Sequence, residues 1–116
     1  MSFFVTTGRI DPERLKEQVR DGACGACVVF EGWIRNHNEG REVLRLEYEV
    51  YEPLAVSEGR RIIGEAADRF GPLHAVCAHR SGLLELEDLA VAVAVSSAHR
   101  DEAFQACRYI IDEVKR

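Results

Sequence analysis

The sequence predicts an α+β fold in which three helices pack on a mixed, mainly antiparallel sheet. Two segments, at residues 53–70 and after residue 97, repeat apolar residues at the spacing of an amphipathic helix. Two others, at residues 43–51 and 89–95, have the two-residue period or the wholly apolar composition of strands. Several strand segments are joined by links of hairpin length, which favours antiparallel neighbours.

The chain begins with a short strand, expected at residues 3–6, and a helix follows it. Asp11 is a favoured N-cap residue, and Pro12 is tolerated at the first helical position because an N–H there would have no helical partner. We expect this helix to run to about Arg20 and to end before the Asp-Gly pair that comes next.

The next strand is expected at residues 23–34, which are rich in β-branched and aromatic side chains. Gly32 within it indicates a bulge or a close backbone approach. Residues 35–40 are polar and predict a loop. Residues 43–51 then alternate apolar and charged side chains, which predicts a half-buried strand.

The second half of the chain predicts two helices and two strands. A helix begins at Pro53 and stops at Gly71, with an apolar stripe of Ile62, Ile63, Ala66 and Phe70. Strands are expected at residues 73–79 and 89–95, and the second should be central because its alternating Val and Ala make both faces apolar. The last helix follows Ser97, with a stripe of Ala103, Phe104, Cys107, Ile110, Ile111 and Val114.

The composition fits a single globular domain covering residues 1–116. Fifteen Lys and Arg against twenty Asp and Glu give a net charge of −5, which argues against a general nucleic-acid binder. No export signal is visible, and the longest apolar run, residues 89–95, is far shorter than the roughly 20 residues needed to cross a bilayer. We therefore expect a cytoplasmic protein with reduced thiols and no membrane partner.

Cys24 and Cys27 form a Cys-x-x-Cys pair that invites a metal or redox interpretation. A zinc site needs about four ligands, and a second pair at suitable spacing is missing. A thioredoxin-like pair would lie at a helix N-terminus, whereas this one leads into a strand, where residues three apart face opposite sides. The pair is interpreted as structural, no metal site is predicted, and Cys77 and Cys107 are expected in the core.

His99 and Arg100 lie at the predicted start of the last helix. A helix N-terminus has unpaired N–H groups and a partial positive charge, so cations there are unfavourable unless an anion binds against them. The pair therefore predicts a phosphate or carboxylate site. The alternative is that both side chains are simply solvated, or that Arg100 pairs with Asp101 or Glu102.

Arg35 follows the second strand at the beginning of the predicted loop, a common position for a substrate-facing side chain. Asn36, His37 and Asn38 can cap turns through their own side chains and so have a local structural role available. Arg35 has no such local role.

These residues belong to a longer ordered pattern. It comprises Phe30-x-Gly32-x-x-Arg35-Asn36-His37-Asn38, His79-Arg80-x-Gly82 and Ser97-Ala98-His99-Arg100, followed by Phe104 and Lys115. In order and spacing the pattern resembles the large, catalytic subunit of molybdopterin synthase over essentially the whole chain. The resemblance implies that family's α+β fold, of the alpha/beta-hammerhead type.

The resemblance also implies a reaction and its partners. In that family, cyclic pyranopterin monophosphate receives two sulfurs and becomes the dithiolene of molybdopterin, a step of molybdenum cofactor biosynthesis. The sulfur arrives as a thiocarboxylate on the C-terminal Gly-Gly tail of a small ubiquitin-like subunit. Two large subunits form the homodimeric core of a heterotetramer, and no cofactor is bound by the large subunit itself.

Carried over residue by residue, the resemblance places Arg35, His99 and Arg100 on the substrate and gives Lys115 and Arg35 a part in the chemistry. Trp33 and Ile34 fall in the same substrate-lining stretch. Relatives often carry a basic residue where this chain has Trp33, and the indole either stacks on the pterin or is a half-buried strand aromatic.

One geometric inference needs only the sequence. Lys115 lies fifteen positions after Arg100, which is about 22 Å along one helix. A compact pocket that uses both residues would therefore combine two chains, with His99 and Arg100 reaching the neighbour's site.

The family normally continues beyond the position of Arg116 with a short segment that carries a second catalytic lysine, and we expect that segment to be missing here. Two alternatives to an active sulfurtransferase follow. One is a weakened or inactive relative that still dimerises and binds the small subunit. The other is a protein that binds a phosphorylated ligand without sulfur chemistry.

Overall fold

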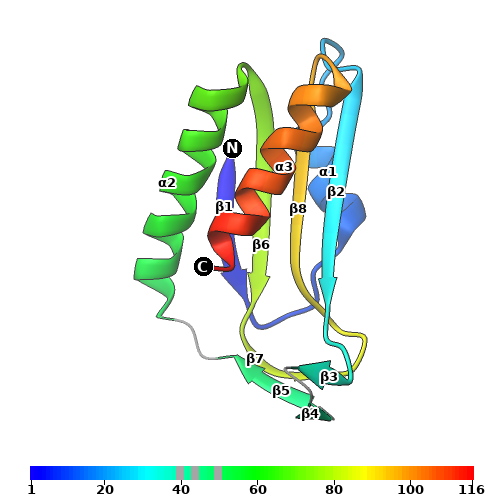
Figure 1. Cartoon of the computed structure of the whole chain (residues 1–116), viewed down its shortest axis with the longest axis vertical. Helices are drawn as coiled ribbons and strands as arrows, with labels where there is room; N and C mark the ends of the chain where they lie inside the picture. The colour runs from blue at the N-terminus through cyan, green and yellow to red at the C-terminus, as the bar shows by residue number, and fades with distance from the viewer. Residues whose placement is uncertain (39–40, 43–44, 49–50) are drawn as a thin grey trace.

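The computed structural model describes residues 1–38, 41–42, 45–48 and 51–116. Within these residues, a four-stranded sheet forms the centre of the molecule, in the order β1-β6-β8-β2 (Figure 1). Its strands are β1 (Ser2–Thr6), β6 (Leu73–Arg80), β8 (Leu89–Ser97) and β2 (Ala26–Trp33). β1 runs parallel to β6, and the other two pairings are antiparallel. The predicted mixed, mainly antiparallel sheet is confirmed.

Three helices cover the two faces of this sheet: α1 (Pro12–Val19), α2 (Glu52–Phe70) and α3 (Arg100–Val114). In Figure 1, α2 and α3 lie in front of the sheet and α1 lies behind it. The valines of β8, at positions 91, 93 and 95, share a core with α2 and α3. Its alanines, at positions 92 and 94, pack with Leu15 and Val19 of α1. The Val-Ala alternation thus serves two cores, and the prediction of a central strand is confirmed.

The helix boundaries agree with the predicted signals. The Asp11 side chain accepts a hydrogen bond from the Glu13 N–H, with Pro12 in the first turn. α2 carries Pro53 in its first turn and ends at Gly71, where φ is 86° and a side chain would be strained. In α3 most of the predicted stripe is buried, but Phe104 is 60% exposed, so the apolar stripe is not covered at this position.

Two short antiparallel pairs lie beyond one end of the main sheet (Figure 1). β3 (His37–Asn38) pairs with β4 (Arg41–Glu42), which corrects the prediction of a plain loop at residues 35–40. β5 (Arg45–Tyr48) pairs with β7 (Gly82–Glu85), so part of the strand predicted at residues 43–51 is present. The rest of that prediction, at residues 43–44 and 49–50, lies outside the described residues.

Among the described residues, no helix is both long and apolar enough to cross a bilayer.

Candidate functional site

The residues predicted for one substrate site lie toward opposite ends of the sheet. In the β2–β8 register, Ala26 pairs with Ser97 at one end and Trp33 pairs with Leu89 at the other. His99 and Arg100 follow the first of these ends, and Arg35 follows the second. The seven steps along β2 span about 23 Å. We call the end with Trp33, Arg35, His79 and Lys115 the lysine end and the end with His99 and Arg100 the arginine end.

Helix α3 connects the two ends. It begins at Arg100 with His99 as its N-cap, and Lys115 is the C-cap residue after Val114. The prediction that one continuous helix separates Arg100 from Lys115 is confirmed, and its length of about 22 Å keeps both side chains out of one pocket of a single chain. Figure 1 shows α3 crossing the front of the sheet obliquely, from its start near β2 toward β1. Lys115, after its last turn, lines a pocket with Trp33 and His79, which places the C-terminus of α3 at the lysine end.

A pocket of about 330 Å³ lies at the lysine end. Its lining consists of Gly32, Trp33, His79, Ala90, Val91, Val114 and Lys115. The Lys115 ammonium lies 5.9 Å from the centroid of the Phe30 ring, within the range of a cation–π contact. Within the described part of the chain, Lys115 has no ion pair. Its amine is therefore available to a bound molecule.

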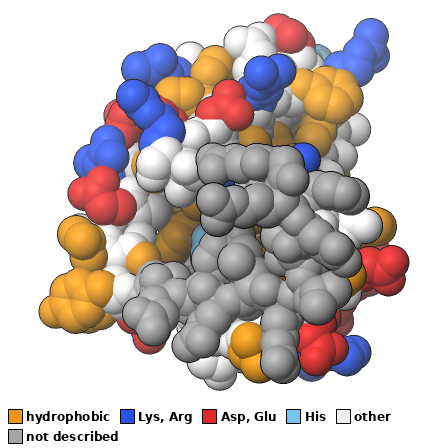
Figure 2. Space-filling view, turned by 60° about the horizontal axis from the view of Figure 1, so that its bottom comes forward, with side chains coloured by type: hydrophobic (Ala, Val, Ile, Leu, Met, Phe, Trp, Pro, Cys, Tyr) orange, Lys and Arg blue, Asp and Glu red, His pale blue; other side chains and the backbone are white. Residues whose placement is uncertain are grey.

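The neighbouring surface of the lysine end carries compensated charges. Figure 2 turns this end toward the viewer and shows acidic and basic side chains next to one another along its rim. Two ion pairs lie among the residues that line a neighbouring pocket with His79, Arg61–Glu58 at 2.7 Å and Arg116–Glu113 at 2.9 Å. These paired groups contrast with Lys115, whose charge is not matched in this way.

The shape of this pocket depends on Gly32, as the sequence indicates. The β2–β8 register shifts between Gly32 and Trp33, which is an irregularity of the β-bulge kind. A Cβ atom at position 32 would lie 2.7 Å from Val91 Cγ1. Glycine thus permits the close approach of β2 to β8 at the point where Trp33 turns outward.

Trp33 is 64% exposed, and its indole N–H donates a 3.0 Å hydrogen bond to Glu31 Oε1. The interpretation of Trp33 as a half-buried strand aromatic is therefore wrong. Trp33 lines the pocket, and the stacking interpretation stays a prediction.

His79 is the neighbour of Lys115 that the site prediction missed, although the residue was part of the motif. Its Nδ1 lies 2.9 Å from the Arg80 carbonyl oxygen, so Nδ1 must carry the proton and Nε2 is the basic atom of the neutral ring. Burial lowers the pKa of His79, the Arg80 carbonyl opposes this, and the Lys115 charge lowers the pKa further. The lysine end thus combines an ammonium group with an imidazole that favours its neutral form.

Arg35 and Ile34 are adjacent but differ in their surroundings. Arg35 is exposed and has no side-chain partner among the described residues. Ile34 is 5% exposed and packs with Leu84 and Ala90. Its N–H donates to the Asp88 carbonyl, and its own carbonyl accepts from the Glu87 N–H. Ile34 supports the end of β2 from within, and its side chain offers no surface to a substrate in this chain.

At the arginine end, His99 and Arg100 are both exposed. His99 makes no side-chain capping hydrogen bond. No ion pair joins Arg100 to Asp101 or Glu102 among the described residues, and Asp101 instead accepts a 2.9 Å hydrogen bond from Gln105 Nε2. The internal pairing considered as an alternative is absent from this part of the chain. Two potential cations therefore project from a helix N-terminus, as an anion site requires.

The cysteines divide as predicted, with one addition. Cys77 and Cys107 are buried, which confirms both as core residues, and this burial raises the pKa of Cys77 to about 12 and that of Cys107 to about 11. Cys27 is exposed on β2. Cys24 is half-buried and lies beside Asp21 and His74, a grouping that the sequence analysis missed. His74 is 53 residues from Asp21, so no local motif indicates their contact.

The known proteins that this chain resembles belong to one family, the one that the sequence pattern indicates. The family described as "MoaE protein" matches residues 5–116. The "Molybdopterin synthase catalytic subunit" of Thermoplasma volcanium is 43% identical over 96% of this chain and 81% of its own length. This chain spans between 56% and 81% of the length of the first curated relatives that it matches.

Solved structures agree. Molybdopterin synthase from Staphylococcus aureus superimposes with a TM-score of 0.94 at 34% identity, covering 98% of this chain and 83% of that one. A structure described as a complex of subunits 1 and 2 of the molybdopterin-converting factor from Helicobacter pylori has a TM-score of 0.79. It covers 98% of this chain and 77% of that one, and at 19% identity it shows a common fold alone.

Proposed function

Because the chain belongs to the MoaE protein family, we propose that it is the catalytic subunit of a molybdopterin synthase. The reaction proposed is sulfur transfer from a thiocarboxylated small subunit to cyclic pyranopterin monophosphate, which yields the dithiolene of molybdopterin. The observation that carries the proposal is the division of the unpaired cations between the lysine end and the arginine end, on either side of α3.

The division of these groups supports a site made by two chains. Arg100 and Lys115 cannot meet in one chain because the helix between them is about 22 Å long. In a dimer, the arginine end of one protomer can lie against the lysine end of its partner. Each of the two sites then receives His99 and Arg100 from one chain and Lys115 from the other.

Each group has a chemical part in this arrangement. Arg35, His99 and Arg100 hold the phosphate of the substrate, since guanidinium groups bind phosphate oxygens through charge-assisted hydrogen bonds. The exposed ring of Trp33 stacks on the pterin. Lys115 supplies an amine, either for proton transfer or for a covalent link to the activated tail of the small subunit.

The partner in this proposal is a small ubiquitin-like subunit with a C-terminal Gly-Gly thiocarboxylate. The fold shared with a chain of the Helicobacter pylori two-subunit complex supports a partner of this kind. With one small subunit on each protomer of the dimer, the assembly is a heterotetramer. The protein itself binds no cofactor in this scheme, and the pterin is its substrate.

A direct assay tests the proposal. The full chain is mixed with a thiocarboxylated small subunit and cyclic pyranopterin monophosphate, and the product is identified by its mass. We expect a product that carries two sulfurs, and none when the small subunit ends in an ordinary carboxylate.

Two outcomes would contradict the proposal. A dimer that binds the small subunit and yields no product would indicate an inactive relative. Binding of the phosphorylated pterin without binding of the small subunit would indicate a ligand-binding protein with no sulfur chemistry.

A further inference from the structure

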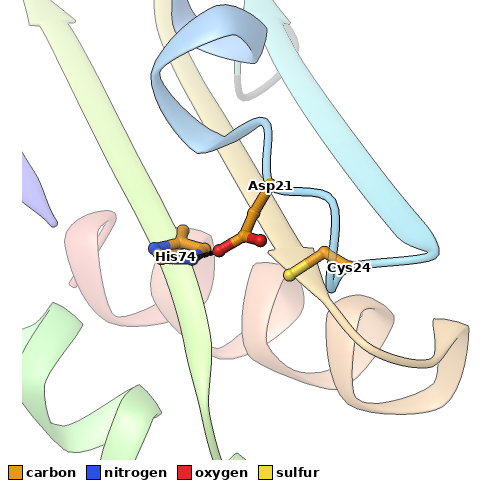
Figure 3. Close-up of side chains that lie close together, drawn as sticks. All are labelled: Asp21, Cys24 and His74. Atoms are coloured by element: carbon orange, nitrogen blue, oxygen red, sulfur yellow. Dashed lines mark hydrogen bonds and ion pairs between the residues drawn. The ribbon is translucent and has the colours of Figure 1, made fainter.

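Asp21, Cys24 and His74 form a cluster at the same end of the sheet as His99 and Arg100. One potential ligand atom of each residue lies within 4.8 Å of the others. Asp21 and Cys24 belong to the loop between α1 and β2, and His74 is the second residue of β6, opposite Ser96 of β8. Figure 3 shows the Asp21 carboxylate between the imidazole and the cysteine sulfur.

The loop that carries two of these residues is held by its own backbone. Asp21 accepts the Ala23 N–H on Oδ1 at 2.8 Å and the Cys24 N–H on its carbonyl at 3.0 Å. The next residue, Gly25, donates its N–H to the Ala98 carbonyl at 3.3 Å, which ties the loop to the end of β8. The Cys24 sulfur is thus brought back toward Asp21 by a turn and fixed against the sheet.

The three side chains are a suitable ligand set for one cation. Thiolate, imidazole and carboxylate all bind Zn²⁺, and sites with three protein ligands leave a fourth position to water. A thiolate and a carboxylate together would neutralise the ion, with His74 as the neutral ligand.

The distances require only small adjustments. His74 Nε2 lies 2.7 Å from Asp21 Oδ2. Ligand atoms of a tetrahedral zinc site lie roughly 3.3–3.6 Å apart, given metal–ligand distances of about 2.0–2.3 Å. The His–Asp pair must open by less than about 1 Å, and the sulfur, which lies within 4.8 Å of the other two ligand atoms, must approach them by at most about 1.3 Å.

An ion can reach this cluster from solvent. The side chains of His74 and Asp21 are 46% and 38% exposed, and Asp21 and Cys24 also border a pocket of about 450 Å³. The cations near that pocket are compensated, Lys16 by Glu13 at 2.8 Å and Arg20 by Glu17 at 3.1 Å. Their charges therefore oppose a metal ion only weakly.

From this geometry we propose that Asp21, Cys24 and His74 form a Zn²⁺ site that links the α1–β2 loop to β6. The site lies outside the machinery of the proposed function. It also differs from the Cys-x-x-Cys interpretation, because Cys27 lies on β2 and is not a member of the cluster. Cys27 provides a matched control, a second thiol three residues away that the site does not use.

Co²⁺ is the probe, because tetrahedral Co²⁺ bound to a thiolate absorbs visible light. The reduced full chain is titrated with Co²⁺, and Zn²⁺ is then added to displace it. We expect one ion per chain. Cys24→Ser, Asp21→Asn and His74→Ala should each weaken Co²⁺ binding by at least about tenfold. Loss of a group that only supports a metal ligand already costs about tenfold in affinity, and loss of a ligand should cost no less. Cys27→Ser and His99→Ala should leave it unchanged.

Thermal unfolding separates loss of the site from loss of the fold. Without metal, Cys24→Ser should unfold at the temperature of the unchanged protein. Added Zn²⁺ should raise the unfolding temperature of the unchanged protein and of Cys27→Ser, because an ion that binds only the folded chain stabilises it, but not that of Cys24→Ser. The proposal is overturned if Cys24→Ser binds Co²⁺ as tightly as Cys27→Ser, or if Zn²⁺ stabilises both variants equally.

Discussion

At the lysine end, Lys115 borders a walled pocket beside Trp33 and His79, whereas at the arginine end His99 and Arg100 project from the first turn of α3. The first region joins an ammonium group that has no ion pair among the described residues to a cavity. The second presents exposed basic groups at a helix N-terminus, and neither His99 nor Arg100 lines the pockets described at the two ends of the sheet. In the proposed function, each region supplies half of a site. A single chain cannot unite them, because a rigid helix separates them.

The largest expected effect comes from placing a substitution of the lysine end and one of the arginine end on different chains of a dimer. Lys115→Ala and Arg100→Ala should each lower synthase activity by about 100-fold or more, as loss of a charge-stabilising group commonly does. A dimer with one chain of each kind retains one site with both Lys115 and Arg100. We expect it to recover about half of the activity of the unchanged dimer, measured after purification through two different tags.

Arg108→Ala is the matched control for that experiment. Arg108 is an exposed arginine on the same helix, paired with Asp112 at 3.3 Å and about midway between Arg100 and Lys115. This variant should keep full activity alone. If the mixed dimer of the Lys115→Ala and Arg100→Ala chains stays inactive, the two half-sites do not combine across chains.

A smaller effect, on the free energy of unfolding, is expected from a substitution in the packing of α2 on β1 near the lysine end. Gly59 of α2 lies against Phe3 of β1, and a Cβ atom there would be 2.1 Å from the ring. Gly59 and His79 both line a pocket of about 510 Å³ next to the end of α3. Gly59→Ala should force α2 away from β1 and lower the free energy of unfolding by about 1–3 kcal/mol, measured by urea denaturation.

Gly64→Ala on the same helix is the control for Gly59→Ala. No atom lies within 4 Å of the Cβ it would add. We expect it to raise the free energy of unfolding by about 0.4–1 kcal/mol, because alanine restricts the unfolded chain and favours the helix. Equal effects from the two substitutions would show that α2 is not packed as tightly against β1 as the structure indicates.

The smallest effect is a pH dependence specific to the lysine end. The folded-state pKa of His79 lies below the ordinary value of 6.5, chiefly because of burial. As the pH falls below about 6.5, the unfolded chain takes up a proton that the folded chain resists, so stability should decrease until the folded-state pKa is passed. His79→Asn should reduce this slope, measured as the free energy of unfolding between pH 7 and pH 5.

The reference for the pH experiment is the unchanged protein, with its free energy of unfolding measured at the same pH values. The charged groups around His79 are Lys115, Arg80 and the residues of the adjoining pocket, Glu58, Arg61, Glu113 and Arg116. An unchanged slope in His79→Asn would show that this imidazole does not resist protonation in the fold.

Much of the fold follows from local patterns. The Asp11 cap, the stop at Gly71 and the Val-Ala alternation of β8 each depend on neighbours within one element, and the structure confirms all three. Gly32 could also be interpreted from the sequence alone, since a glycine within a strand indicates a bulge or a close approach of another backbone. Phe104 shows the limit of such patterns, because its position on the apolar stripe of α3 does not tell whether another element covers it.

The contacts that build the sites are not local. His74 meets Asp21 across 53 residues, and His79 meets Lys115 only because β6 and the end of α3 converge. The pairing of β3 with β4 within an apparently polar loop was missed for a related reason, since polar composition does not exclude a short hairpin.

The sequence by itself determined that Arg100 and Lys115 lie on one helix, about 22 Å apart, because helical rise is a property of the backbone. It also determined which positions are glycine, cap or apolar stripe. Only the tertiary structure decided how α3 crosses the sheet, so that Lys115 lines a pocket with Trp33 while Arg100 remains toward the other end. The order of strands and the packing of helices depend on which apolar surfaces bury one another, and that is settled only when the whole chain folds.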